Sequence, residues 1–427
     1  MCARGRRRGA QAAARRPSAA ARLVDARDVD LVRLRRLAQH EGLADAGGAY
    51  YTRRRAWPML LGVNAYMSGA EGYAARARPH KDSGTVEKDV ERSLHSLVPP
   101  GINPAEFARL RAALHRLVDG VVSGSALAPA PGLGAGDQGG SEAEAGCISY
   151  FQGFHDVASV LLLVLGEPAA HPVLERLALF HLRSCTRTTL DPVLGLLGLL
   201  LPLLGQLDAD LAAKLAPAPV FWAVSWVMTW FAHSAESLDA AARLFDLFIP
   251  SSPLMPLYAS AAMAVLARPR LDAHSEGYDP ALVHHCLATM RVGGGNAACD
   301  GVVSADALAD LTLRLFAEFP PHRLLALGAD PGAPPVPLDD LALWPYPWLA
   351  NSTMPGDARL AILAERARRA GHDAPPSLPA PTISNARAAG AVTAHPYVAQ
   401  RALVAAAGIF GAMLAMGVTS AVLSGVR

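Results

Sequence analysis

One short segment, Val86-Glu-Lys-Asp89-Val-Glu-Arg92, holds an acid and a base three residues apart. On a helix, residues at positions i and i+3 are neighbours, so Asp89 and Arg92 can form an ion pair. Taken alone, this spacing indicates an ordinary ion pair on the surface of a helix.

A second segment, residues 149–157, places a Gln-Gly dipeptide among aromatic residues at the start of a long apolar run. The amide of Gln152 can both donate and accept hydrogen bonds, so it could orient a water molecule or act as a local helix cap. Gly153 permits close approach of another surface or a sharp entry into a helix. His155 and Asp156 suit acid–base chemistry or a metal, but no third ligand stands at helical spacing, so we expect no metal site.

Helices must position both segments. Asp82 and Ser83 can cap a helix that continues through Leu94 and stops before the Pro-Pro-Gly sequence at 99–101. No stretch alternates apolar and polar residues between hairpin turns, so the predicted fold class is all-α. Other helices are expected over about 29–43, 52–61, 104–122, 154–166, 169–185, 190–207, 208–215, 219–234, 237–249, 253–267, 278–290 and 303–318.

Together the two segments resemble the TBC-domain family of Rab GTPase-activating proteins, which carry an arginine-finger motif IxxDxxR and a glutamine-finger motif YxQG. Here the motifs stand as VEKDVER at 86–92, with valine in place of isoleucine, and YFQG at 150–153. The resemblance covers about residues 45–320. It implies a TBC-type helical domain.

Three other stretches are similar to the same family. Arg54–Gly62 resembles its early RxxW…LLG segment, and Trp226–Phe231 resembles a later Trp-rich helix. Ala242–Asp246 resembles an RLWD-like helix, with Phe245 in place of the usual tryptophan.

The resemblance implies that the chain activates a Rab-family GTPase and is not itself an enzyme. GTP hydrolysis needs its developing phosphate charge neutralised and its attacking water oriented. An arginine finger supplied by a helper protein is worth about 10³–10⁵ in rate for GTPases. Arg92 would neutralise the phosphate charge, and Gln152 would position the water. No cofactor is expected in this chain, because GTP and Mg²⁺ belong to the partner.

Four more residues of the two motifs are expected to support the site or bind the GTPase. Asp89 would orient Arg92 or hold its helix. Tyr150 and Gly153 would shape the loop that presents the glutamine. Asp156, three residues after the YFQG motif, is the fourth residue expected to support the site or bind the GTPase.

Composition excludes several classes of protein. Hydrophobic residues make up 52% of the 427, which is enough for a large buried core. A net charge of only +2 argues against a nucleic-acid partner. The five cysteines form no CxxC pair, so we expect neither a disulfide framework nor a zinc site.

The helical domain is expected to occupy residues 26–320 between segments of other composition. Residues 1–25 are Arg- and Ala-rich and predict a disordered basic tail, with a transit peptide as the alternative. Residues 123–146 are rich in Gly, Ala, Ser and Pro and predict a flexible insert that loops out. Residues 321–400 are dense in proline and predict a linker.

Residues 401–427 predict a transmembrane tail anchor. The run 402–426 holds no charge and is bounded by Arg401 and Arg427. As a helix it exceeds the thickness of a hydrocarbon layer of about 30 Å. This tail and residues 149–167 resemble the membrane-anchored branch of the TBC family, which implies a single-pass protein of the endoplasmic reticulum or early secretory membranes.

Two other interpretations remain open. One is a catalytically silent TBC-fold scaffold, although such members typically lack one or both fingers, and Arg92 and Gln152 are present here. The other is a polytopic membrane protein. Its best inner segment, 193–207, is interrupted by Pro202 and short for a span.

The anchor prediction is tested by removing residues 401–427. The truncated protein should leave carbonate-washed membranes and appear in the soluble fraction, because no other uncharged run is as long. Retention of the truncated protein in the membrane pellet would show that another segment spans the bilayer.

Overall fold

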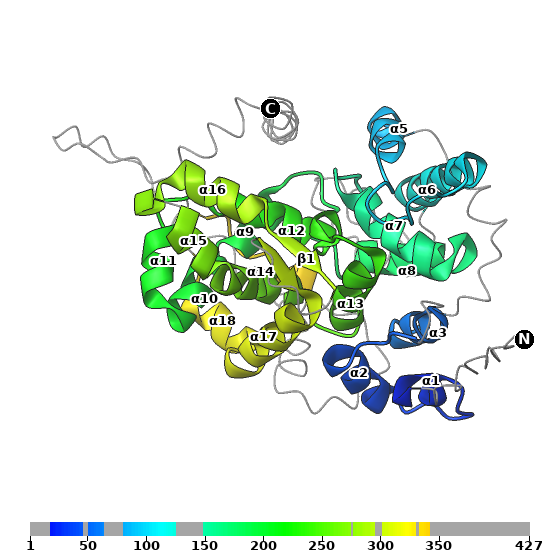
Figure 1. Ribbon diagram of the computed structural model, residues 1–427, viewed down its shortest axis with the longest axis horizontal. Coiled ribbons are helices and arrows are strands. Elements are labelled where there is room, and N and C mark those ends of the chain that lie inside the picture. Colours follow the sequence, from blue (N-terminus) through cyan, green and yellow to red (C-terminus); the bar gives the residue numbers. More distant parts are fainter. Residues whose placement is uncertain are drawn as a thin grey trace, which may run out of the picture.

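Leucine, alanine and valine recur at helical spacing along the chain, and the chain folds into helices (Figure 1). Many of these residues are buried in the hydrophobic core. The computed structural model describes residues 18–45, 50–63, 80–124, 148–274, 276–294, 301–329 and 333–341. The predicted helical fold is confirmed. Nearly all of the predicted insert, the linker from residue 342 onward and the predicted tail anchor lie outside the described residues, as does the start of the predicted basic tail.

The first half of the chain supplies helices around the two candidate segments: α1 (Ala19–Val24), α2 (Leu31–His40), α3 (Tyr51–Leu60), α5 (Ser83–Glu91), α6 (Pro104–Gly124), α7 (Phe154–Leu165) and α8 (Glu167–Leu179). Figure 1 shows α5 to α8 grouped on one side of the molecule, with α1 to α3 beside them. Helix α7 packs against α6 and α8 and also contacts α3. It is therefore central to this half of the domain.

The second half contributes shorter helices and one pair of strands: α9 (Asp191–Leu197), α10 (Leu200–Leu207), α11 (Ala209–Leu215), η2 (Val220–Ala223), α12 (Val224–Thr229), η3 (Ala232–Ser234), α13 (Leu238–Phe248), α14 (Met255–Leu266), α15 (Arg268–His274), η4 (Glu276–Tyr278), α16 (Pro280–Ala288), β1 (Arg291–Gly293), β2 (Val302–Ser304), α17 (Ala305–Glu318), α18 (Pro321–Leu327) and η5 (Leu338–Leu341). The η elements are 3₁₀ helices. Helices α12 and α13 contact α7, which joins the two halves.

The two strands are the exception to the predicted all-α class. β1 and β2 pair in parallel, with Val292 opposite Val303. Each strand has only three residues. The sequence pattern missed them because alternation cannot be recognised over so short a length.

Residues 1–25 were predicted to be disordered, and this prediction is wrong for residues 18–24, which form α1 and its cap. Ser18 caps α1 by accepting a hydrogen bond from the backbone N–H of Ala21 at 3.0 Å. Ala20 and Val24 are buried against the core. The amphipathic turn therefore buries enough apolar surface to order the chain before residue 26.

The predicted linker also begins too early. Leu324 of α18 and Leu341 of η5 are buried. The carbonyl oxygen of Pro335 lies against Gly195, where a Cβ atom would be only 2.4 Å away. Proline breaks the helical pattern after residue 320, yet the described residues 321–329 and 333–341 include side chains that pack onto the domain.

Membrane-spanning potential was assessed over the described residues only. Within them, no single helix is both long and apolar enough to cross a bilayer. One pair, Ala209–Leu215 with Val220–Thr229, meets the length and composition requirement, but it is bent by 108°.

An aromatic cluster fixes the turn between α12 and η3. Trp230 and Phe231 have positive φ angles of 52° and 61°, which is unusual for side chains of this size. Phe231 stacks on Trp226 with ring centroids 5.4 Å apart, and Trp230 contacts Phe245 edge-on at 5.3 Å. Burial of these rings offsets the backbone strain. It also fixes the turn that precedes residue 233, and so fixes the position of that residue.

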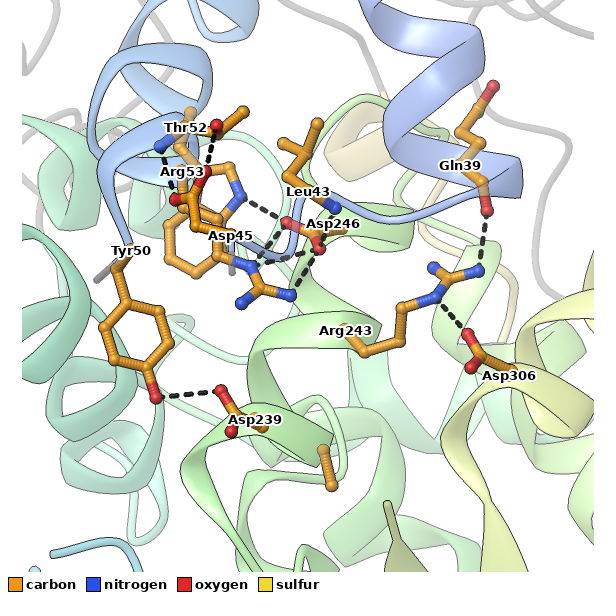
Figure 2. A network of polar contacts seen from close by, with 12 residues as sticks. Gln39, Leu43, Asp45, Tyr50, Thr52, Arg53, Asp239, Arg243, Asp246 and Asp306 are labelled. Carbon is orange, nitrogen blue, oxygen red and sulfur yellow. Dashed lines mark hydrogen bonds and ion pairs between the residues drawn. The ribbon is translucent and has the colours of Figure 1, made fainter. Parts of the chain in front are cut away.

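A buried carboxylate ties the N-terminal helices to α13 (Figure 2). Asp246 is fully buried and accepts hydrogen bonds from Arg53 Nη2 at 2.8 Å, Trp57 Nε1 at 2.8 Å and the backbone N–H of Leu43 at 2.8 Å. Four donor groups, including Arg53 Nε at 3.1 Å, surround one carboxylate that would otherwise be costly to bury. The packing of α3 on α13 therefore depends on this residue.

Arg243 extends the same network along α13 (Figure 2). Its Nη2 atom donates to the carbonyl of Gln39 at 3.1 Å, and its Nε atom pairs with Asp306 of α17 at 2.6 Å. The α13 helix thus holds α2 on one side and α17 on the other.

Asp246→Ala tests this arrangement. The variant leaves Arg53 buried without its counterion, so the free energy of unfolding should fall by about 3–5 kcal/mol. Chemical denaturation measures the change. The control is Asp25→Ala, which breaks a half-exposed pair with Arg55 and should cost about 0–1 kcal/mol. Equal losses in the two variants would contradict a central role for Asp246.

Candidate functional site

Helix α5 ends earlier than the sequence predicts, and this places Arg92 at its C-terminus. The predicted helix continued through Leu94, but that residue has a positive φ of 75°. The Ser93 hydroxyl donates to the carbonyl of Asp89 at 2.5 Å and closes the last turn. A cation at a helix C-terminus is favoured by the helix dipole, and the Arg92 side chain is 47% exposed there.

Asp89 joins the two motifs. Its side chain is only 2% exposed. One carboxylate oxygen accepts from Arg92 Nη2, and the other accepts from the hydroxyl of Tyr150 at 2.7 Å. Asp89 and Tyr150, which are 61 positions apart in sequence, therefore meet through one buried carboxylate.

The hydroxyl of Tyr150 is held inside this site. Burial raises its pKa far above the ordinary value, and the hydrogen bond to Asp89 adds to the effect. The hydroxyl also lies 3.0 Å from Nδ1 of His155. Tyr150 therefore stays protonated and connects the end of α5 to the start of α7.

The glutamine segment is fixed on both sides of Gln152. Phe151 and Phe154 are buried with ring centroids 5.3 Å apart. Gly153 adopts φ 105° at the start of α7, and a Cβ atom there would lie 2.7 Å from Cγ2 of Thr229. Glycine is thus required for both backbone angle and close packing. Gln152 itself is half-buried and makes no hydrogen bond within the described part of the chain.

His155 and Asp156 belong to a third group of polar residues behind the glutamine segment. Nε2 of His155 lies 3.4 Å from one oxygen of Asp156, and Nδ1 of His233 lies 3.3 Å from the other. Sequence reasoning missed His233, because nothing in its neighbourhood marks it out. The turn after the Trp-rich segment brings it to this position.

The charges in this group are coupled. Burial alone would raise the pKa of Asp156, but the charges of His155, His233 and Arg92 outweigh burial and lower it. The hydrogen bond to Asp156 raises the pKa of His233 above its ordinary value, although the charges of Arg291 and Arg92 oppose this rise. Asp156 is therefore a stable anion between two imidazoles.

No group of three or more His, Cys, Asp or Glu side chains that could hold a metal ion occurs among the described residues. The two groups available for chemistry are the half-exposed guanidinium of Arg92 and the half-buried amide of Gln152. Arg92 can bind phosphate oxygens with two parallel N–H groups. Gln152 can bond a water molecule as donor and acceptor. The site suits the stabilisation of a charged group supplied by another molecule.

Comparison with known proteins gives matches to proteins with a TBC domain. The family model of the Rab-GTPase-TBC domain matches residues 144–271. TBC1 domain family member 20 of Homo sapiens is 32% identical over 301 residues, which cover 69% of this chain and 65% of the relative. The Bos taurus protein of the same name is 31% identical over 307 residues, 70% of this chain and 66% of the relative. The chain thus spans slightly less than two thirds of the length of these relatives.

Two further matches come from more distant sources. The GTPase-activating protein gyp10 of Schizosaccharomyces pombe is 38% identical over 120 residues, which cover 28% of this chain and 32% of the relative. A solved structure, the Chlamydomonas flagellar RabGAP TBC domain, aligns with a TM-score of 0.45 and 14% sequence identity. The alignment covers 66% of this chain and 83% of the chain in that structure.

Gly153→Ala tests how the glutamine segment is held. The alanine would meet a left-handed φ and a contact with Thr229 at 2.7 Å, so the free energy of unfolding should fall by about 1–3 kcal/mol. The double variant Gly153→Ala/Thr229→Ser should recover only part of the loss, because it removes the contact and leaves the backbone strain. Thermal melting measures both.

The matched control is Gly84→Ala. Gly84 lies exposed in α5, and a Cβ atom added there would meet nothing within 4 Å, so this variant should be neutral or more stable by up to about 1 kcal/mol. If Gly153→Ala were as well tolerated as Gly84→Ala, the description of the loop would be wrong.

Proposed function

This chain belongs to the family of proteins that carry a Rab-GTPase-TBC domain, and from that premise we propose that it accelerates GTP hydrolysis by a Rab-family small GTPase. The observation that carries the proposal is the shared carboxylate of Asp89. It contacts Arg92 of one motif and Tyr150 of the other, so a single buried residue sets the position of both motifs.

Arg92 would act as the arginine finger. Its guanidinium stands half-exposed at the end of α5 and is restrained from behind by Asp89. Restraint matters because a flexible arginine would lose side-chain entropy when it meets the nucleotide. The guanidinium stays charged at any physiological pH and can bond two oxygens of the transferring phosphoryl group.

Gln152 would act as the glutamine finger. Its neighbours Phe151 and Gly153 are fixed by aromatic packing and by the contact with Thr229, while its own amide is left without a hydrogen bond among the described residues. An amide held in this way can orient the attacking water, which the GTPase's own glutamine does in Ras. GTP and Mg²⁺ would be bound by the GTPase.

The cellular setting is part of the proposal. The uncharged run 402–426 would anchor the chain in a membrane, with the TBC domain facing the cytosol. A GTPase of the endoplasmic reticulum or early secretory pathway would then meet the fingers at the membrane surface.

Substitution of each finger tests the function. A panel of purified Rab GTPases is first assayed with the parent protein to find one whose hydrolysis it stimulates. On that GTPase, Arg92→Ala should lower the single-turnover rate by about 10³-fold or more, and Gln152→Ala should cause a loss of similar order. Arg92→Lys should fail nearly as badly, because an ammonium lacks the planar fork.

Controls separate this result from a folding defect. Arg314→Ala on α17 and Gln206→Ala on α10 replace exposed residues of the same types and should keep the parental rate. Gln152→Ala and the two control variants should melt as the parent does. Arg92→Ala removes a donor from the buried Asp89, so it should melt at a lower temperature than the parent but remain folded at the assay temperature. If Arg92→Ala retained the parental rate on a stimulated GTPase, Arg92 would be only a surface ion pair. If the parent stimulated no Rab GTPase, a non-catalytic scaffold would be the better description.

A further inference from the structure

Helix α6 packs beside α5 and contacts the chain on both sides of Arg92 (Figure 1). The carbonyl of Glu91, the last residue of α5, accepts a hydrogen bond from Nη1 of Arg111 at 2.8 Å. Beyond Arg92, the imidazole of His95 packs against the ring of Phe107, with ring centroids 4.9 Å apart. Phe107 and Arg111 are one helical turn apart on α6, so they are neighbours on one face of that helix.

The hydrogen bond from Arg111 satisfies a backbone group that α5 leaves without a partner. The last four carbonyl groups of an α-helix accept no hydrogen bond within the helix, and cations are favoured beside them. Here the carbonyl belongs to the peptide bond that joins Glu91 to Arg92. Arg111 therefore restrains the peptide from which the main chain of Arg92 begins.

The guanidinium of Arg111 is itself restrained. It lies over the ring of Phe107, with 5.3 Å between Cζ and the ring centroid, in a cation–π contact. Phe107 also packs against the hydrophobic core, so the ring has a fixed position. A donor held in this way loses less side-chain entropy in its hydrogen bond than a fully mobile arginine would.

This contact complements the restraint that Asp89 provides. Asp89 binds the guanidinium at the tip of the Arg92 side chain. The reach and direction of that tip also depend on the main chain below it. Regular helix ends at Glu91, and Leu94 already has a positive φ of 75°. The contacts with α6 hold the chain at the point where the hydrogen-bonding pattern of the helix ends.

We propose that Arg111 is a positioning residue for the arginine finger: by binding the carbonyl of Glu91 it holds the main chain of Arg92 where the guanidinium can meet the transferring phosphoryl group. This inference rests on the proposed function for its effect on GTP hydrolysis. The order that Arg111 gives to the end of α5 does not depend on a partner.

A direct contact between Arg111 and the GTPase is the alternative role. Arg111 is half-buried and pairs with no carboxylate among the described residues. Its replacement therefore leaves no buried charge unpaired, and the variants should fold. A direct contact would strengthen binding of the GTPase, whereas a positioning contact would change the rate at saturation.

Three variants of α6 separate these roles. Arg111→Ala removes the donor and the charge, and Arg111→Lys keeps a charged donor of similar reach. Arg109→Ala is the matched control, because Arg109 is an exposed arginine of the same helix. Two residues correspond to about 200° around a helix, so Arg109 and Arg111 point to different sides.

Hydrogen exchange of the full chain in detergent micelles, without a GTPase, gives the first readout. The segment 89–96 should exchange about tenfold faster in Arg111→Ala than in the parent, because the end of α5 loses a charge-assisted hydrogen bond. Exchange elsewhere in the chain should be unchanged. The segment should exchange at nearly the parental rate in Arg111→Lys and at the parental rate in Arg109→Ala.

Single-turnover kinetics give the second readout. On a GTPase that the parent stimulates, Arg111→Ala should lower the maximal rate by about tenfold and leave the half-saturating concentration unchanged, because it misplaces Arg92 without removing it. Arg111→Lys should recover most of the rate, and Arg109→Ala should match the parent.

A double-variant cycle tests whether Arg111 acts through Arg92. The affinity is measured for the GTPase loaded with GDP and aluminium fluoride, which mimics the transferring phosphoryl group. Arg111→Ala should weaken this complex about tenfold in the parent, but by less than about twofold in the Arg92→Ala background, where no guanidinium is left to position. A residue that touched the GTPase directly would weaken the complex by the same factor in both backgrounds.

Four results would overturn the inference. They are parental exchange of segment 89–96 in Arg111→Ala, a rise in the half-saturating concentration at an unchanged maximal rate, equal weakening of the complex in both backgrounds, and equal losses of rate in Arg111→Ala and Arg111→Lys. A parent protein that stimulates no Rab GTPase would instead contradict the proposed function. Hydrogen exchange would still decide whether Arg111 orders the end of α5.

Discussion

A carboxylate can be buried at low cost only where donors surround it, and this constraint organises the molecule in two places. Asp246 collects donors from α3 and from the segment before it, and so attaches the N-terminal helices to α13. Asp89 collects donors from both motifs of the candidate site. In each place at least one donor lies far in sequence from the carboxylate, so the buried charge specifies which segments meet.

The surface around Asp89 follows from the same constraint. Arg92 is exposed enough to reach another molecule, yet its inner edge is held by a residue that water barely reaches. Behind the glutamine segment, Asp156 lies between His155 and His233 and stays ionised. At this site the carboxylates of Asp89 and Asp156 are buried, and the cations that pair with them, Arg92 and His233, are partly exposed. An arrangement of this kind presents positive charge outward without a buried charge left unpaired.

The sequence predicted the members of this site better than their surroundings. The spacing of Asp89 and Arg92 follows from helix geometry alone, and their contact is present in the structure. The early end of α5 was missed, because it depends on the positive φ of Leu94, which tertiary packing imposes on a residue without that preference. His233 was missed because only the aromatic cluster places it beside Asp156.

The same limits apply to the core. The resemblance to the TBC family placed Arg54 in an RxxW segment but assigned no partner to any arginine there; in the structure Arg53 pairs with Asp246, while Arg54 donates to the carbonyl of Val164 at 2.8 Å. Neighbouring arginines differ by about 100° around a helix, so only packing against α13 decides which of them is buried. Helix α1 was missed for a similar reason, since three buried residues in a helix of only six residues are too weak a pattern to recognise.

The central claim is that this chain supplies both the charge and the water-orienting amide for GTP hydrolysis by its partner. The most direct measurement is the single-turnover rate on a stimulated Rab GTPase whose own catalytic glutamine is replaced by leucine. Because Gln152 would perform that residue's task, the account predicts stimulation within about tenfold of that seen with the unchanged GTPase. Loss of stimulation by about 10³-fold, as expected for a GTPase that must orient its own water, would contradict it.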